Sequence, residues 1–90
     1  MREAISVCLD DAKAFQESLE QVLATESGSR FQITHSSCSA AHEMDKASIV
    51  SLIEEIDDVI ESPFEFDTIR IKFWALKGKR RVPHYMMIRR

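Results

Sequence analysis

The alternation of apolar and polar residues from 67 to 76 is the feature that most limits what this chain can fold into. Apolar side chains recur at every second position, which is the period of a β-strand with one buried face. Gly78 and Lys79 follow, and glycine at the first central position of a two-residue loop is typical of a type II′ hairpin turn. We therefore predict a C-terminal β-hairpin in which Lys77 lies opposite Arg80.

This register gives the predicted hairpin two chemically different faces. The inner face is almost wholly apolar and holds the pairs Ile69–Ile88, Ile71–Met86, Phe73–His84 and Ala75–Val82. The outer face carries cations and two aromatic rings, in the pairs Trp74–Pro83, Lys72–Tyr85, Arg70–Met87 and Thr68–Arg89. Because proline cannot donate to a ladder, we expect the last strand to be an edge strand or to carry a bulge at Pro83.

Two more strands and a helix are predicted in the first half of the chain. Residues 3–9 and 30–35 alternate with a period of two, which indicates half-buried strands. Between them, apolar residues recur at helical spacing, with Asp10 or Asp11 as the expected N-cap and Gly28 as the expected end. The spacing suits a right-handed crossover, so we expect these two strands to be parallel.

A second helix follows a small, polar stretch at 36–41 that predicts a loop. We expect this helix to begin between Ser39 and Asp45 and to end at Ser62, because Pro63 disfavours helical geometry in the residue before it. Its apolar stripe consists of Ile49, Leu52, Ile53, Ile56 and Ile60. Most of its other side is acidic and is formed by Glu54, Glu55, Asp57, Asp58 and Glu61.

The predicted fold class is α+β, a two-layer sandwich in a single domain that spans residues 1–90. The element order is β-α-β-α-β-β, with a four-stranded mixed sheet that ends in the hairpin. Two amphipathic helices can cover only one face of such a sheet, so the other face is expected to be open. The open face would present Ser6, Cys8, Gln32, Thr34, Arg70, Lys72, Trp74, Tyr85, Met87 and Arg89.

This order of elements resembles that of the Alba chromatin proteins and of the C-terminal domain of bacterial translation initiation factor three. Members of both families bind nucleic acid, and the resemblance therefore implies a nucleic-acid-binding module. It covers the order of the elements and no sequence motif, so no residue role is carried over.

Charge is strongly segregated along the chain. All fifteen acidic residues lie within residues 1–67 together with only four basic ones, Arg2, Lys13, Arg30 and Lys46, which gives this part a net charge of −11. Residues 68–90 hold eight basic residues and no acidic one, a net charge of +8, so that the whole chain carries −3. Such segregation bears on association with charged partners rather than on the fold.

The basic, aromatic hairpin predicts a small non-enzymatic module that binds RNA or DNA. Cations neutralise phosphates, and aromatic rings stack on unpaired bases. Four cations at the hairpin tip would also repel one another unless they meet anions. The predicted nucleic-acid-binding residues are Arg70, Lys72, Trp74, Lys77, Lys79, Arg80, Arg81, Tyr85 and Arg89.

The alternative is a protein-interaction module, such as an inhibitor or regulator. It would use the open sheet face, or it would present Glu54, Glu55, Asp57, Asp58 and Glu61 to a basic protein partner. A homo-oligomer, most simply a dimer, is expected in either case, because a chain of this length holds only one modest core.

Neither a metal site nor a catalytic site is predicted. His35, Cys38 and His42 lie close in sequence, and Cys8 could add a fourth ligand, but their spacing matches no strong zinc pattern. Cys38 could act as a nucleophile with His35 or His42 as its base. However, the sequence shows no recognisable turn that would present the cysteine and no third group to complete the site. We therefore expect no cofactor and no enzymatic activity.

The chain is expected to be soluble and cytoplasmic. No apolar run approaches the roughly 20 residues of a membrane span, and the N-terminus does not have the pattern of a secretory signal. Two cysteines are too few for a disulfide scaffold and suit a reducing compartment.

Overall fold

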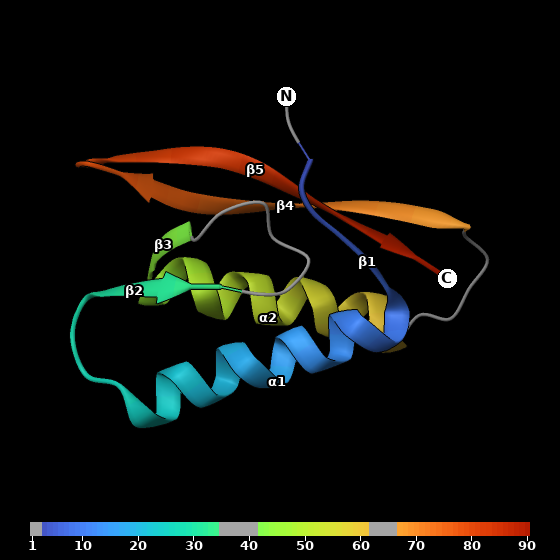
Figure 1. The fold of residues 1–90 in the computed structure, drawn as a ribbon, viewed down its shortest axis with the longest axis horizontal. Coiled ribbons are helices and arrows are strands. Elements are labelled where there is room, and N and C mark those ends of the chain that lie inside the picture. Colours follow the sequence, from blue (N-terminus) through green and yellow to red (C-terminus); the bar gives the residue numbers. More distant parts are fainter. Residues whose placement is uncertain (1–2, 35–41, 62–66) are drawn as a thin grey trace.

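The computed structural model describes residues 3–34, 42–61 and 67–90, which form two layers (Figure 1). Two helices, α1 and α2, lie side by side on one face of a five-stranded sheet. The elements are β1 (Glu3–Cys8), α1 (Leu9–Thr25), β2 (Arg30–Ile33), β3 (His42–Asp45), α2 (Lys46–Glu61), β4 (Thr68–Lys77) and β5 (Arg80–Arg89). The predicted α+β class is confirmed. Among the described residues, no helix is long and apolar enough to cross a membrane.

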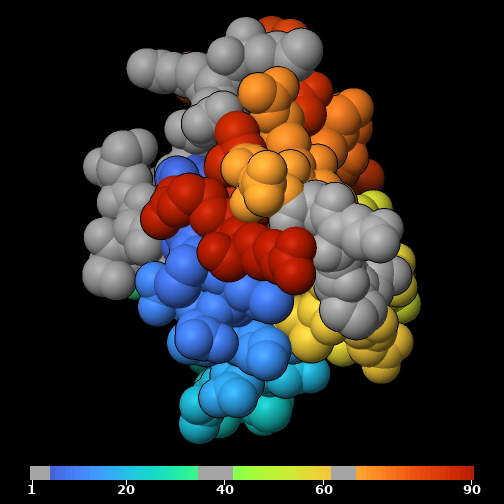
Figure 2. All heavy atoms as spheres, turned by 90° about the vertical axis from the view of Figure 1, so that its right-hand side faces the viewer, coloured from blue at the N-terminus to red at the C-terminus, as the bar shows by residue number. Residues whose placement is uncertain are grey.

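The sheet has the strand order β1-β5-β4-β3-β2. β1 pairs with β5 in parallel, and the other neighbours, β5–β4, β4–β3 and β3–β2, are antiparallel. At the end of the sheet seen in Figure 2, the last residues of β5 lie between the beginning of β4 and the first turns of α1. The Arg90 N–H donates to the Asp67 carbonyl across a distance of 3.0 Å and closes the ladder there.

The C-terminal hairpin forms in the predicted register. Its ten pairs run from Thr68 opposite Arg89 to Lys77 opposite Arg80. Gly78 has a φ of 67°, in the left-handed region that a two-residue hairpin turn requires at its first central position. The predicted pairing of β4 with β5, and with it the predicted assignment of side chains to the two faces of the hairpin, is confirmed.

The prediction of four strands is wrong, because β3 occupies part of the segment that we expected to be loop or helix. Only Met44 of this four-residue strand is fully buried, so the sequence carries too little alternation to reveal it.

α2 begins at Lys46, one residue beyond the predicted range. Asp45 caps it, since its Oδ1 accepts a hydrogen bond from the Ser48 N–H at 2.9 Å.

The prediction that the first two strands are parallel is also wrong. β1 lies at one edge of the sheet beside β5, and β2 lies at the other edge beside β3 and runs opposite to β1. The hairpin separates them, and a period of two says nothing about which strands are neighbours. The resemblance in element order was based on four strands and does not hold for this five-stranded arrangement.

The ends of α1 differ from the predicted ones. The helix begins directly after β1, with Cys8 at the N-cap position and without a side-chain cap hydrogen bond. Asp10 and Asp11 lie in the first turn, where carboxylates interact favourably with the helix dipole. The helix ends at Thr25, three residues before Gly28.

Pro83 lies on an interior strand, at a position where none of the described residues of β1 pairs with β5. β5 is flanked by β4 and β1, but β1 pairs with β5 only from Tyr85 onward among the described residues. The irregularity in this pairing lies between Glu3 and Ile5 on β1 rather than at Pro83. The missing N–H of Pro83 therefore leaves no gap in a ladder within the described part of the chain.

The core lies between the inner face of the sheet and the two helices. Every strand and both helices contribute apolar side chains to it. The fully buried, larger members are Ile5, Val7, Phe15, Leu19, Met44, Ile49, Leu52, Ile56, Met86 and Ile88. This layer leaves the opposite face of β4 and β5 without helical cover (Figure 1).

Replacing Leu52 tests this packing. Leu52 is 1% exposed, and Leu52→Ala should lower the free energy of unfolding by about 2–5 kcal/mol because it removes buried methyl groups and leaves a cavity. Val50→Ala is the matched control on the same helix, since Val50 is 39% exposed and its truncation should change stability by about 0.5 kcal/mol or less. Urea denaturation measures both, and equal losses would contradict this core.

Candidate nucleic-acid interface

The outward face of the hairpin brings together the predicted binding residues of its two strands. Along β4 the exposed positions alternate with buried ones, and the pairing with β5 continues the same face across the hairpin. Lys72 lies directly opposite Tyr85, and Trp74 is the diagonal neighbour of Tyr85. The remaining members of the face on these two strands are Thr68, Arg70, Leu76, Arg81, Pro83, Met87 and Arg89.

Two cations lie over the two aromatic rings of this face. The Arg70 Cζ is 5.6 Å from the centroid of the Tyr85 ring, and the Lys72 Nζ is 5.0 Å from that of Trp74. Contacts of this kind are worth about 0.5–1 kcal/mol at exposed sites. Trp74 is 38% exposed, which is unusual for so large an apolar side chain. Each ring therefore has a positive charge beside it and surface that remains accessible.

Arg89 occupies the end of the face that is nearest to β1. Its Nη1 donates to the Ser6 Oγ at 2.6 Å and so links the outward faces of β5 and β1. Ser6 was predicted to lie on the open face, and this contact agrees with that placement. The hydroxyl carries no charge, so it orients the guanidinium without neutralising it.

All four cations of the hairpin tip, Lys77, Lys79, Arg80 and Arg81, are exposed. Arg81 differs from the other three in its contact with a carboxylate, because its Nε and Nη2 donate to the Asp45 Oδ2 at 3.1 and 2.5 Å. Hydrogen bonds from Ser48 and from Arg81 lower the pKa of Asp45 to about 2. The negative charge of Asp45 thus lies against Arg81, which makes Arg81 the weakest candidate for a phosphate contact among the four.

Arg30 is part of the same end of the molecule and was not among the predicted site residues. Its Nη2 donates to the Glu43 Oε1 at 2.7 Å and to the Gly78 carbonyl at 2.8 Å. β2 thereby holds the turn of the hairpin. Sequence reasoning missed this contact because it depends on β3, which brings β2 next to the hairpin.

A ring cluster lies on the inner side of the sheet near the tip. The His42 ring is 5.0 Å from that of His84 and 5.7 Å from that of Phe73, measured between centroids. Burial, and then the charge of His84, lower the pKa of His42. The Nε2 of His42 is buried and has no hydrogen-bond partner within the described residues.

The structure describes only part of the histidine and cysteine group that was considered, and not predicted, as a metal site. His35 and Cys38 lie outside the described residues. Within the described ranges, no group of three or more histidine, cysteine or acidic side chains could hold a metal ion. Cys8 has a free thiol.

The acidic residues of α2 are exposed in the other layer of the molecule. Ser48, Ile49, Leu52, Ile56 and Val59 form the buried side of this helix, and the acids lie outside that stripe. The exposed acids are Glu54, Glu55, Asp57, Asp58 and Glu61. The segregation of charge along the sequence thus becomes a segregation between a basic sheet face and an acidic helix face.

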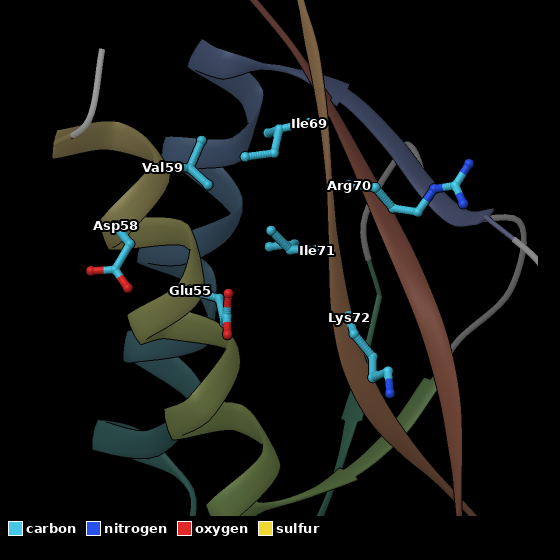
Figure 3. A pocket seen from close by; sticks show the side chains of 7 residues that line it. All are labelled: Glu55, Asp58, Val59, Ile69, Arg70, Ile71 and Lys72. Carbon is cyan, nitrogen blue, oxygen red and sulfur yellow. The ribbon is translucent and has the colours of Figure 1, made fainter. Parts of the chain in front are cut away.

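A groove of about 390 Å³ runs between α2 and β4 and was not predicted. Val59, Ile69 and Ile71 give it an apolar floor (Figure 3). Glu55 and Asp58 line it on the helix side. The sequence could not reveal this groove, because its position depends on how α2 packs against β4.

Comparisons with protein-family models, curated proteins and solved structures found no match for this chain. Its function is therefore argued from the arrangement of its own side chains.

The double role of Asp45 yields a pH-dependent prediction. Its pKa of about 2 in the folded protein lies below the usual 3.8 of an aspartate, so its stabilising effect is present above pH 3.8 and is lost as the pH falls towards 2. Asp45→Ala should cost about 0.5–2 kcal/mol at neutral pH through loss of the cap, whereas Asp45→Asn keeps a good cap and loses only the carboxylate charge.

Urea denaturation between pH 2 and pH 7 measures the free energy of unfolding of these variants. The wild-type curve should fall more steeply than that of Asp45→Asn between pH 4 and pH 2. Parallel curves would show that neither Ser48 nor Arg81 perturbs this carboxylate in solution.

Proposed function

We propose that the protein binds single-stranded RNA or DNA on the outward face of β4 and β5. One observation carries the proposal: Trp74 and Tyr85 lie on an open sheet face with Lys72 and Arg70 beside their rings. An acid-free segment supplies all four side chains. Stacking on aromatic rings next to phosphate-binding cations is the usual means by which a sheet holds unpaired bases.

The spacing of the two rings supports the binding of successive bases. Trp74 and Tyr85 are diagonal neighbours, a relation that separates backbone positions on paired strands by about 7–8 Å. Bases on these rings would bring their phosphates near Arg70 and Lys72. Arg89 would extend the basic surface towards β1, and Lys77, Lys79 and Arg80 would extend it along the tip.

The protein is not expected to be an enzyme or to need a cofactor for this function. We place it in the cytoplasm, where the free thiol of Cys8 would stay reduced. Homodimer formation remains part of the proposal, because a second copy would double the basic surface available to one strand.

Removing Trp74 tests the stacking contact. Trp74→Ala should weaken the binding of a labelled single-stranded oligonucleotide by about 1–3 kcal/mol, or roughly 5- to 150-fold in Kd. Val50→Ala is the control, since it truncates the other large apolar side chain that is exposed in the described structure, on the helix layer. Fluorescence anisotropy measures both, and an unchanged Kd for Trp74→Ala would contradict stacking.

The tip cations should determine the salt dependence. For a single strand, the slope of log K against log salt changes by about 0.7 for each phosphate contact that is lost. Lys79→Gln and Arg80→Gln should each reduce the slope by about this amount, whereas Lys46→Gln, at the beginning of α2, should leave it unchanged. Absence of binding at low salt in the wild type would direct attention to protein partners instead.

A further inference from the structure

The ammonium group of Lys72 lies over the ring of Trp74, the larger of the two aromatic side chains on the proposed binding face. Its Nζ is 5.0 Å from the ring centroid, within the roughly 6 Å over which a ring attracts a cation. The two residues are two positions apart on β4, so their side chains leave the strand on the same side. Figure 3 shows Lys72 on the side of β4 that faces away from α2. Part of the tryptophan surface is therefore already occupied by a cation of the protein itself.

Two cations are neighbours of Trp74 in the ladder, and they are held in different ways. Arg81 is diagonal to it on β5 and donates two hydrogen bonds to the Asp45 carboxylate. Lys72 is exposed and contacts the ring, which is a weak attraction at an exposed site. Its charge is carried on a flexible four-carbon stem. Lys72 is thus the cation that can leave its partner more easily.

A base that stacks on the covered side of Trp74 has to displace the ammonium group. Loss of such a contact corresponds to a factor of about two to five in an equilibrium constant. An uncharged aromatic compound offers the ammonium group nothing in return. A nucleotide strand offers it a phosphate, and a charge-assisted hydrogen bond is roughly twice as strong as a neutral one. Stacking of the base and binding of the phosphate are therefore coupled through one side chain.

We propose that Lys72 determines the specificity of this face by covering Trp74 until a backbone phosphate draws its ammonium group away. The inference rests on the proposed function and adds the chemistry of the preferred ligand, a strand with a charged backbone. Selectivity requires a cost for the wrong ligand as well as a gain for the right one. The cover supplies that cost, because an uncharged aromatic compound must break the contact without compensation.

Two probes separate the base from the charge of its backbone. One is a six-nucleotide oligodeoxyadenylate with phosphodiester linkages, and the other carries the same bases on a methylphosphonate backbone, which is uncharged. Trp74 is the only tryptophan of the chain, so quenching of its fluorescence reports stacking at this ring without a label. Titration of the protein with each probe gives the two dissociation constants.

Lys72→Ala should have opposite effects on the two probes. It should tighten binding of the methylphosphonate probe by about two- to fivefold, because the ring is no longer covered. It should weaken binding of the phosphodiester probe and lower the log–log salt slope by about 0.7, because one phosphate contact is lost. Lys72→Arg keeps a cation that can lie over the ring and should stay close to the wild type. Lys13→Ala, which removes an exposed charge from α1, should change neither constant.

A measurement without nucleic acid tests the cover itself. Acrylamide, an uncharged quencher, should quench Trp74 more strongly in Lys72→Ala than in the wild type, and Lys13→Ala should match the wild type. Equal quenching in all three proteins would overturn the proposal. Unchanged, weaker or undetectable binding of the methylphosphonate probe by Lys72→Ala would also overturn it. Both results would leave the proposed function standing, whereas failure of the wild type to bind the phosphodiester probe would refute that function and this inference with it.

Discussion

The antiparallel ladder between β4 and β5 is the interaction on which the rest of the structure depends. Ten consecutive pairs hold the two strands in one register, and exposed positions alternate with more buried ones along most of β4. The same alternation that directs Ile71 and Met86 into the core directs Lys72 and Tyr85 outward. A shift by one residue would exchange the two faces completely, so the apolar core and the basic surface specify each other.

The ends of the hairpin are tied to the remaining elements by polar contacts with distinct roles. Asp45 caps α2 and binds Arg81, so one carboxylate links the start of a helix to the tip of the hairpin. Arg30 links β2 to the turn through the Gly78 carbonyl. At the opposite end, Arg89 reaches Ser6 on β1. These contacts add to the backbone pairing that joins β1 to β5 and β3 to β4.

Sequence reasoning succeeded where the information is local and periodic. It found the hairpin register, the two amphipathic helices and the open face on β4 and β5. It failed for β3, whose single buried residue, Met44, gives no detectable period, and for the sheet order, which depends on long-range pairing. The groove beside Val59 and the contacts of Arg30 were hidden for the same reason, since both depend on how separate elements pack against one another.

The account places a basic, aromatic surface on one layer of the molecule and an acidic surface on the other. An amide NMR titration of the isotope-labelled protein with a short single-stranded oligonucleotide tests it most directly. The account predicts that the largest shift changes fall on Arg70, Lys72, Trp74, Tyr85 and Arg89, with little change along α2. Shift changes concentrated on α2, or none at all at low salt, would contradict it.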